Sequence, residues 1–381
     1  MFGAEIYRGS SYGDRHPLRV PRVSTVMDLT RALGWLPASQ FQNSPRAKPK
    51  ALRAWHTPDY IAALERAERD QFVSEAVRKR HGLGTVSNPI YPEMFRRPAT
   101  SAGASLMSGA HLADGGIVYH PSGGTHHGMP DRAAGFCYLN DPVLAMLSLR
   151  AAGVMRMAYL DIDAHHGDGV EHAFAGDRDV LLISVHEERR WPFTGLLQDD
   201  AGGNALNLPV PKELNDSEMA EIRDGLLIPA IAAHEPEAII LQCGADAVTE
   251  DPLSRLALSN NAHWNVLRAI LALGCDRLLV LGGGGYNPWS VGRLWAGLWG
   301  ILNGRDVSQP VTQDGQFVLR ALEWHHARAG KDPPEHWFTT LQDEPRPGPI
   351  RSELRARIAE LQVRPAAQGR ILSEKVGIDL S

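Results

Sequence analysis

The side chains of this sequence that could do chemistry are concentrated between Tyr159 and Asp168, in the run Tyr-Leu-Asp-Ile-Asp-Ala-His-His-Gly-Asp. A short apolar stretch leads into this run and predicts a buried strand. Alternate side chains of a strand share one face, so Asp161, Asp163 and His165 are predicted to point the same way. Clustered acids and imidazoles at a strand end need a cation to offset their charge. Asp163 and His165 are therefore predicted to bind a divalent metal; the alternative is a solvated loop in which His165 is incidental.

A third metal ligand is expected, because a catalytic zinc site has three protein ligands and one open position. Asp246, in Gln-Cys-Gly-Ala-Asp (residues 242–246), is the best candidate, and its alternative role is a helix N-cap. Asp251 is a weaker candidate, further along the same loop. Two carboxylates and one imidazole suit Zn²⁺ and also Fe²⁺, so the ligand types leave the metal open.

Two adjacent histidines, His126 and His127, lie between glycines in Gly-Gly-Thr-His-His-Gly (residues 123–128). The glycines can bend this loop so that both imidazoles enter one cavity, which favours general acid–base chemistry over a structural role. Each imidazole needs an orienting carboxylate, and Asp161 and Asp168 are the spare acids of the metal cluster. Tyr286 follows four glycines, which let its hydroxyl approach a polarised carbonyl closely. A phosphate-binding loop is the alternative for these glycines, but no G-x-x-x-x-G-K-[ST] pattern follows.

These residues need a scaffold, and the chain predicts alternating strands and helices. Short apolar runs predict strands, and longer periodic runs between them predict helices. This alternation is typical of an α/β domain with a central, mostly parallel sheet and helices on both faces. The predicted strands are residues 4–7, 116–119, 157–161, 180–185, 238–241 and 277–281, and the main predicted helices are residues 26–33, 101–112, 142–152, 216–234 and 262–273.

Five of the predicted strands lead directly into a polar or glycine-rich stretch that carries candidate residues. In a parallel α/β sheet the ligand crevice lies at the carboxyl ends of the strands. The sequence therefore predicts one active site at that edge of the sheet.

Composition narrows the class of protein. The chain has 381 residues, of which 43% are hydrophobic, a formal net charge of −5 and three cysteines. These values predict a globular enzyme with a full core and give no sign of a nucleic-acid-binding surface. The few scattered cysteines favour a reducing cytoplasm, and neither a signal peptide nor a membrane-spanning apolar run is evident.

The chain is predicted to have one catalytic domain, residues 1–302, followed by a helical extension, residues 303–381. The extension is polar and interrupted by prolines, with helix-like stretches at residues 316–328 and 350–361. We expect it either to wrap the same domain or to mediate assembly into a homo-oligomer.

Taken together, the motifs resemble those of the zinc-dependent histone deacetylase superfamily, in particular its bacterial branch of acetoin-utilisation and acetylpolyamine amidohydrolase proteins. The resemblance runs from His16 to about residue 300. It implies the single-domain arginase/deacetylase-like fold. The motifs are Gly-Thr-His-His-Gly (124–128), Gly-Phe-Cys-Tyr-Leu-Asn-Asp (135–141), Asp-Ile-Asp-Ala-His-His-Gly-Asp (161–168), Gly-Ala-Asp (244–246) and Gly-Gly-Gly-Gly-Tyr-Asn (282–287).

The resemblance implies a role for each candidate catalytic residue. His127, backed by Asp168, would be the general base and acid. His126, paired with Asp161, would act through its charge. Tyr286 would donate a hydrogen bond to the oxyanion.

The resemblance also implies two ion sites and a substrate tunnel. The zinc ligands would be Asp163, His165 and Asp246. A structural monovalent cation, K⁺, would be held by Asp161, Asp163, His165, Ser184 and the backbone carbonyl of Val185. The tunnel for the acyl-lysine chain would be lined by Gly135, Phe136, Trp191, Leu253 and Gly284.

The leading hypothesis is zinc-dependent hydrolysis of an acyl amide, either acetyl-lysine in a protein or a small acetyl-lysine-like amide. The alternatives are an acetylpolyamine amidohydrolase, a binuclear manganese ureohydrolase, and a binding or scaffold protein without catalysis. Ureohydrolases of this fold carry a second Asp-x-Asp pair where this chain has only Asp246. The catalytic positions are all filled, which argues against a scaffold.

Two positions depart from the family pattern, and a third bears on the choice of substrate. Ser87 stands in the loop where an aspartate commonly grips the substrate backbone, which predicts loose sequence selectivity. Thr125 replaces the usual glycine or leucine before the histidine pair. Leu253 is neutral where relatives that hydrolyse acetylpolyamines can have an acid, so acyl-lysine is predicted to be preferred over N-acetylputrescine or N-acetylspermidine.

Overall fold

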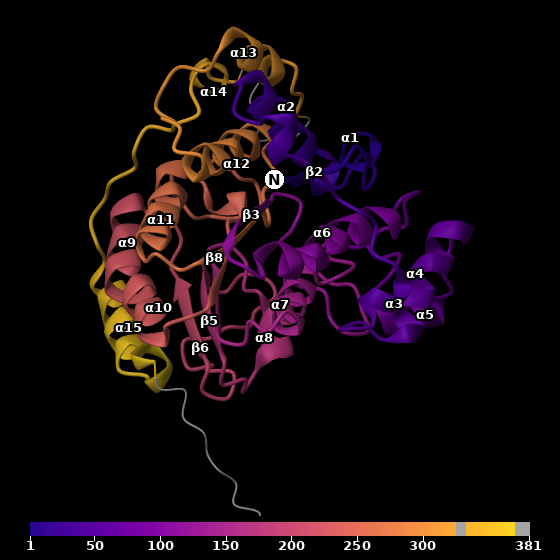
Figure 1. The fold of residues 1–381 in the computed structure, drawn as a ribbon, viewed down its shortest axis with the longest axis horizontal. Helices are drawn as coiled ribbons and strands as arrows, with labels where there is room; N and C mark the ends of the chain where they lie inside the picture. Colours follow the sequence, from indigo (N-terminus) through magenta and orange to yellow (C-terminus); the bar gives the residue numbers. More distant parts are fainter. Residues whose placement is uncertain (325–332, 370–381) are drawn as a thin grey trace, which may run out of the picture.

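A parallel sheet of six strands organises the computed structural model, which describes residues 1–324 and 333–369. The strand order is β3-β8-β7-β4-β5-β6, and every neighbouring pair is parallel. Figure 1 shows the sheet between two groups of helices. The strands are β3 (Gly116–His120), β4 (Met157–Asp161), β5 (Val180–Glu187), β6 (Ala205–Val210), β7 (Ala238–Gln242) and β8 (Arg277–Leu281).

The predicted fold class is confirmed, because the central sheet is parallel and helices flank it. The five strands predicted from residue 116 onward are present, but β6 is missing from the sequence predictions. Its sequence, Ala-Leu-Asn-Leu-Pro-Val, contains Asn207 and Pro209, which weaken a strand pattern. Because β6 lies at the edge of the sheet, it tolerates a proline that a central strand would exclude.

Two helical layers cover the sheet, one on each face (Figure 1). One layer packs through a cluster that includes Ala104, Val143 and Val170, and the other through a cluster that includes Met219 and Trp264. The first layer consists of α6 (Arg96–Leu112), α7 (Asp141–Ala151) and α8 (Asp168–Phe174). The second consists of α9 (Asp216–Ile222), a π-helical turn (Arg223–Leu227), α10 (Ile228–His234), α11 (Asn260–Ala272) and α12 (Pro288–Leu302).

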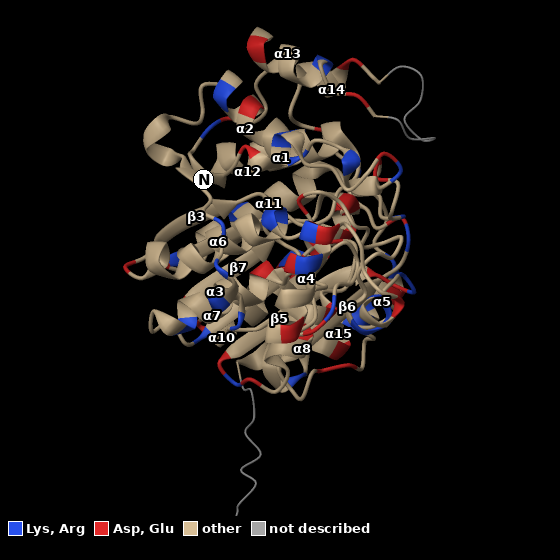
Figure 2. Cartoon of the chain, turned by 90° about the vertical axis from the view of Figure 1, so that its right-hand side faces the viewer, with Lys and Arg blue, Asp and Glu red and all other residues tan. Residues whose placement is uncertain are grey.

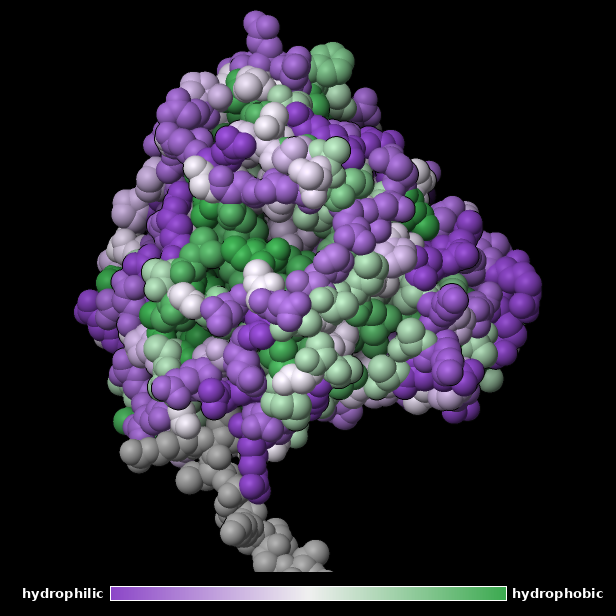
Figure 3. Space-filling model, viewed as in Figure 1, coloured by the Kyte–Doolittle hydropathy of each residue, from purple (hydrophilic) through white to green (hydrophobic). Residues whose placement is uncertain are grey.

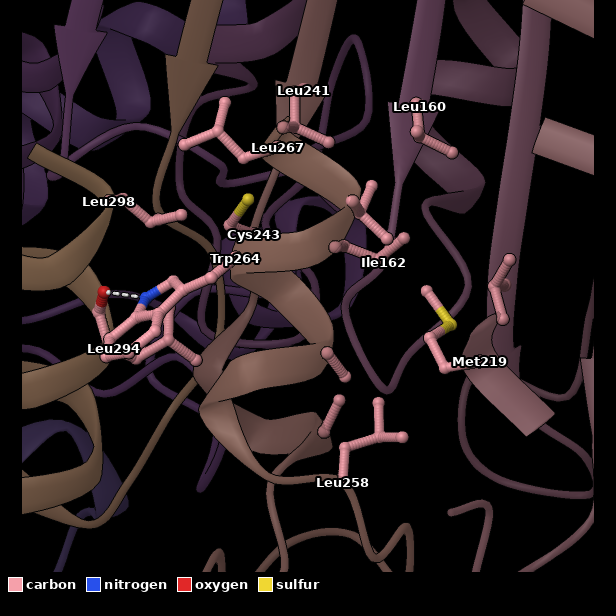
Figure 4. Packing of buried hydrophobic residues seen from close by; sticks show 14 of the residues in the cluster. Leu160, Ile162, Met219, Leu241, Cys243, Leu258, Trp264, Leu267, Leu294 and Leu298 are labelled. Atoms are coloured by element: carbon pink, nitrogen blue, oxygen red, sulfur yellow. Dashed lines mark hydrogen bonds between the residues drawn. The ribbon is translucent and has the colours of Figure 1, made fainter. Parts of the chain in front are cut away.

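Packing in the core explains why the apolar runs of β4 and β7 form buried strands. Figure 4 shows Leu160 and Leu241, from two adjacent strands, in the same buried cluster as Trp264 and Leu267 of α11. Trp264 satisfies its one polar atom by donating from Nε1 to the Leu294 carbonyl at 3.0 Å. The residues that alternate with these along the strands face the other helical layer, so the whole of β4 and β7 is buried.

Smaller elements precede the sheet in the chain. The predicted strand at residues 4–7 is wrong: the strand β1 is Phe2–Gly3, and α1 begins at Ile6. The run was too short for its periodicity to distinguish a strand from a helical turn. The other elements of this region are β2 (Gln42–Asn43), which pairs with β1, and α1 (Ile6–Gly9), α2 (Val23–Ala32), α3 (Pro49–Leu52), α4 (Pro58–Asp70) and α5 (Glu75–His81).

The residues after α12 run back over the same body of the protein (Figure 1). α13 packs against α2, and α15 packs against β6. The helix predicted at residues 316–328 begins earlier and ends at Arg320, and residues 325–328 lie outside the described part of the chain. These helices are α13 (Gln313–Arg320), α14 (His336–Thr339) and α15 (Ser352–Gln362).

Among the residues that the structure describes, four short 3-10 turns complete the secondary structure, and one of them, after β7, carries a candidate metal ligand. They are η1 (Pro17–Arg19), η2 (Ala38–Gln40), η4 (Ala245–Ala247) and η5 (Pro365–Gln368).

On the face shown in Figure 3, hydrophobic residues gather near the middle and hydrophilic residues lie around them. Among residues 1–324 and 333–369, no helix combines the length and the apolar character needed to cross a membrane.

Candidate metal centre and active site

Two neighbouring strands deliver three potential metal ligands to one point. β4 ends at Asp161 and β7 ends at Gln242, and these two residues are partners in the sheet register. Asp163 and His165 follow β4, and Asp246 follows β7. Their donor atoms all lie within 4.8 Å of one another, with His165 Nδ1 2.9 Å from Asp246 Oδ2. One cation can therefore reach all three side chains.

Backbone amides hold the two carboxylates in place. The Gly284 N–H donates to Asp163 Oδ2 at 2.6 Å, and the Ala164 N–H donates to Asp246 Oδ1 at 3.0 Å. A Cβ atom at Gly284 would lie only 2.2 Å from Asp246 Oδ2. Position 284 therefore requires glycine, because the loop after β8 passes directly beside the candidate metal ligands.

The donor set fits a divalent cation. Asp163 and Asp246 are buried, and burial together with the Asp163 charge raises the pKa of the Asp246 carboxyl above its ordinary value. A doubly charged cation would relieve this repulsion. Two carboxylate oxygens and one imidazole nitrogen suit Zn²⁺ or Fe²⁺. Within the described part of the chain, this is the only convergent group of three such side chains.

The two adjacent histidines have different partners and different electrostatics. His126 Nδ1 lies 2.7 Å from Asp161 Oδ2, and His127 Nδ1 lies 2.7 Å from Asp168 Oδ1. Burial opposes a charge on His126, but Asp161 and Asp163 outweigh it and raise the pKa of His126 to about 9. Burial and the neighbouring His126 charge lower the pKa of His127 to about 4, against the attraction of Asp168. In the metal-free site His127 is therefore the imidazole that is free to accept a proton at neutral pH, and His126 is the one that the carboxylates favour in its protonated form.

Asn140 and Asp141 fix the loop that carries the histidines. The Asn140 side-chain amide donates to the carbonyls of His126 at 3.1 Å and Gly128 at 2.9 Å, and Asn140 also caps α7. Asp141 accepts from the Thr125 N–H at 2.8 Å. Neither residue has a role among the sequence predictions, although an asparagine before Asp-Pro is typical of a helix N-terminus.

Tyr286 follows β8 across four glycines and lines the same inner cavity as the histidines. Gly283 and Gly285 have φ angles of +136° and +130°, which other residues rarely adopt. The Tyr286 N–H donates to Asp251 Oδ2 at 2.7 Å, so Asp251 supports this backbone and lies outside the metal cluster. Burial and the nearby carboxylates raise the pKa of the Tyr286 hydroxyl well above its ordinary value, which keeps it a hydrogen-bond donor.

Trp191 forms one wall of the passage to the metal cluster. The centre of its ring lies 4.6 Å from that of His127, edge to face. A Cβ atom at Gly135 would lie 2.3 Å from the Trp191 ring and 2.6 Å from the His127 ring. Glycine at position 135 is therefore what allows the indole and the imidazole to meet.

Phe136 and Leu253 also line this passage. The Phe136 ring lies 5.7 Å from the Tyr286 ring, edge to face. These residues, with Gly135 and Trp191, line an outer cavity of about 510 Å³ that reaches the histidines. Gly284 lies deeper, in the lining of the inner cavity. All five predicted tunnel residues are thus gathered between the surface and the metal cluster.

The residues predicted to hold a monovalent cation lie at the junction of β4 and β5. Asp161 and Ser184 are register partners, and Val185 is next along β5. Asp163 and His165 follow Asp161 directly. A cavity of about 10 Å³ lies beside Asp161 and Ser184, enough for one small ion or water. The identity of any ion there stays a prediction.

Arg22 also reaches the site, although it lies far away in the chain. Its Nη1 donates to the Gly283 carbonyl at 2.7 Å, and its side chain lines the inner cavity with His126 and Asp163. The lining of the inner cavity therefore includes a guanidinium group, that of Arg22. No local pattern distinguishes Arg22 from a surface arginine, so only the fold identifies it.

Known proteins are similar to this chain in both sequence and fold. The family model described as "Histone deacetylase domain" matches residues 16–302. The chain is 31% identical to the acetoin utilization protein AcuC of Bacillus subtilis, over 80% of this chain and 82% of AcuC. It is 32% identical to histone deacetylase 8 of Xenopus tropicalis, over 79% of this chain and 83% of that protein.

Solved structures extend the likeness to the whole architecture. An HDAC homolog from Aquifex aeolicus matches with a TM-score of 0.89, and an HDAC homolog complexed with SAHA matches with a TM-score of 0.88. Each is 31% identical, and each match covers 95% of this chain and 98% of the other.

Proposed function

Because the chain belongs to the histone deacetylase family, we propose that it is a zinc-dependent amidohydrolase that removes the acyl group from acetyl-lysine-like amides. One observation carries the proposal: two of the candidate metal ligands, both histidines and Tyr286 line a single cavity. Three kinds of group that amide hydrolysis needs, a metal site, a proton acceptor and an oxyanion donor, thus face the same space.

The proposed reaction divides the work among these side chains. Bound zinc would polarise the amide carbonyl and lower the pKa of the attacking water. His127 Nε2 takes a proton from the water and gives it to the leaving amine, because its Nδ1 is engaged by Asp168. Tyr286 donates to the carbonyl oxygen as negative charge develops there, and the charge of His126 favours the same change. The products are a free amine and a carboxylate.

The shape of the passage supports a lysine side chain as the group that enters it. Trp191, Phe136 and Leu253 provide apolar walls for an aliphatic chain. An ammonium within that chain would find no acid at Leu253, and the nearby Asp251 is buried and accepts the N–H groups of Leu253 and Tyr286. Acyl-lysine therefore suits the passage better than an acetylated polyamine does.

The proposal also includes the predicted monovalent-cation site and the predicted C-terminal extension. K⁺ would occupy the small cavity beside Asp161 and Ser184. Residues 303–381 would form an extension of the catalytic domain, residues 1–302; its described parts, 303–324 and 333–369, would pack on that domain, and the rest lies outside the described residues. The bond from Arg351 Nε to the buried Glu218, 2.6 Å long, supports this arrangement for the part of the extension around α15.

Substrate comparison tests the proposal. We expect kcat/KM for an acetyl-lysine peptide to exceed that for N-acetylspermidine by at least roughly tenfold, since the secondary ammonium gains no partner in the passage. Leu253→Glu adds an acid in the passage and should reduce the ratio of kcat/KM for the acetyl-lysine peptide to kcat/KM for N-acetylspermidine. Leu253→Met is the neutral control. A clear advantage for N-acetylspermidine in the native protein would instead assign the chain to polyamine hydrolysis.

A further inference from the structure

The outer cavity in front of the candidate catalytic residues is lined with basic side chains. This cavity, of about 510 Å³, is bounded by Arg189, Arg190, Lys212 and Arg255. These residues come from three different loops, after β5, β6 and β7. The fold therefore gathers separate positive charges around the entrance that a substrate has to pass.

The lining of this cavity holds little negative charge. Among the described residues that line this cavity, Glu187 alone is acidic. Its side chain is 1% exposed and is bound by Arg190, with Nε at 2.5 Å and Nη2 at 2.8 Å, so these two charges cancel. Arg189, Lys212 and Arg255 are exposed, and their side chains form no ion pair with any residue in the described ranges.

The basic character continues into a neighbouring cavity of about 330 Å³. Arg15 and Arg19 line it and are exposed, against a single acid, Asp14. Arg19 donates to the backbone carbonyl of Asp14 at 2.6 Å and not to its carboxylate. Because Leu253 and Tyr286 line both cavities, the two form one entrance region. We call this region the basic mouth.

The basic mouth contrasts with the rest of the protein. The chain has a formal net charge of −5, and Figure 2 shows Lys and Arg interspersed with Asp and Glu along the chain. Arg190 also fixes the geometry of the mouth, because its Nη1 donates to the Leu253 carbonyl at 2.7 Å and joins two of the loops. A local positive field at the entrance attracts anions and repels cations.

We infer that the basic mouth is an anion-binding subsite that selects acyl-lysines flanked by acidic residues. This inference rests on the proposed function. A lysine whose side chain fills the passage leaves its own backbone and its neighbours at the mouth. Exposed aromatic rings, Trp191 at 40% and Phe193 at 68%, lie among the cations and offer contact area for a peptide. An acidic peptide therefore matches both the charge and the apolar surface.

Three matched peptides test the inference on the native protein. Each carries a central acetyl-lysine, and the flanking residues are glutamate, glutamine or arginine. We expect kcat/KM to fall in that order, with roughly a tenfold range between the glutamate and arginine peptides at about 50 mM salt. The ratio of kcat/KM between the glutamate and arginine peptides should fall to about twofold at about 500 mM salt, because salt screens charges at an exposed surface.

A charge-reversal variant tests which residues are responsible. Lys212→Glu combined with Arg255→Glu should reverse the preference, so that the arginine peptide becomes the better substrate relative to the glutamine peptide. The matched control is Arg305→Glu, an exposed arginine just beyond the far end of α12, which should keep the native preference. If the double variant does not fold, the salt dependence of the native protein still decides.

The possible outcomes distinguish the proposed deacylase function from the inferred anion-binding subsite. No hydrolysis of any of the three peptides would overturn the proposed function, and this inference with it. Hydrolysis of all three with equal kcat/KM at low salt would overturn the inference alone. A preference for glutamate flanks that survives the double charge reversal would also contradict it.

Discussion

Replacing Asp246 with alanine should remove the metal and the activity together. Asp246 is one of three side chains whose donor atoms converge within 4.8 Å. With Asp163 and His165 alone, a cation would keep only two protein ligands, fewer than a catalytic zinc site uses. We expect a zinc content near zero and a loss of kcat/KM of at least about a hundredfold. Even the mutation of a residue that only hydrogen-bonds to a metal ligand typically lowers metal affinity or activity by about 10–100-fold.

The measurement pairs metal analysis of the purified variant with kinetics on an acetyl-lysine peptide. Asp114→Ala is the matched control. Asp114 is an exposed aspartate just before β3, at the amino end of that strand, whereas the candidate site lies at the carboxyl ends of the strands. Circular dichroism should show that both variants keep the fold. An Asp246→Ala protein that retained a full equivalent of zinc would show that Asp246 is not a ligand.

Replacing Tyr286 with phenylalanine should leave the zinc content and the fold intact while lowering kcat by roughly 10² to 10³, the scale of one oxyanion donor. The hydroxyl stays protonated, because burial and the nearby carboxylates raise its pKa. The backbone position does not depend on it, since Asp251 holds the Tyr286 N–H and the preceding glycines set the turn. The substitution therefore removes a donor without moving the loop.

Tyr119→Phe provides the control for losing a buried hydroxyl elsewhere. Tyr119 lies on β3 and donates to the Trp295 carbonyl at 2.8 Å, away from the site. This variant should lose about 1 kcal/mol of stability and keep its turnover. If Tyr286→Phe also kept near-native turnover, the oxyanion role of Tyr286 would be wrong.

The sequence predicted much of the site because its residues lie in short motifs at strand ends. Asp163, His165, Asp246 and Tyr286 each follow a strand whose apolar run is recognisable, and parallel strands bring their carboxyl ends to one edge. The same logic failed for β6, where Pro209 interrupts the pattern. It failed at the N-terminus too, where a short run folded as a helical turn.

Other parts of the site depend on contacts between distant segments, which no local pattern contains. Arg22 reaches Gly283 only through the packing of the N-terminal region on the sheet. Arg189, Lys212 and Arg255 look like ordinary surface charges in the sequence, and the fold alone gathers them around one cavity. Periodicity and motifs predict elements and their ends; they do not predict the electrostatics of a surface built from several loops.

Titration of the metal-free protein with zinc tests the central claim most directly. Hydrolysis of a neutral-flanked acetyl-lysine peptide should rise in proportion to added zinc and reach its maximum at one equivalent per chain, because the described residues offer one convergent set of three ligands. Absence of hydrolysis at every zinc level, or full activity only with two equivalents of manganese, would contradict this account.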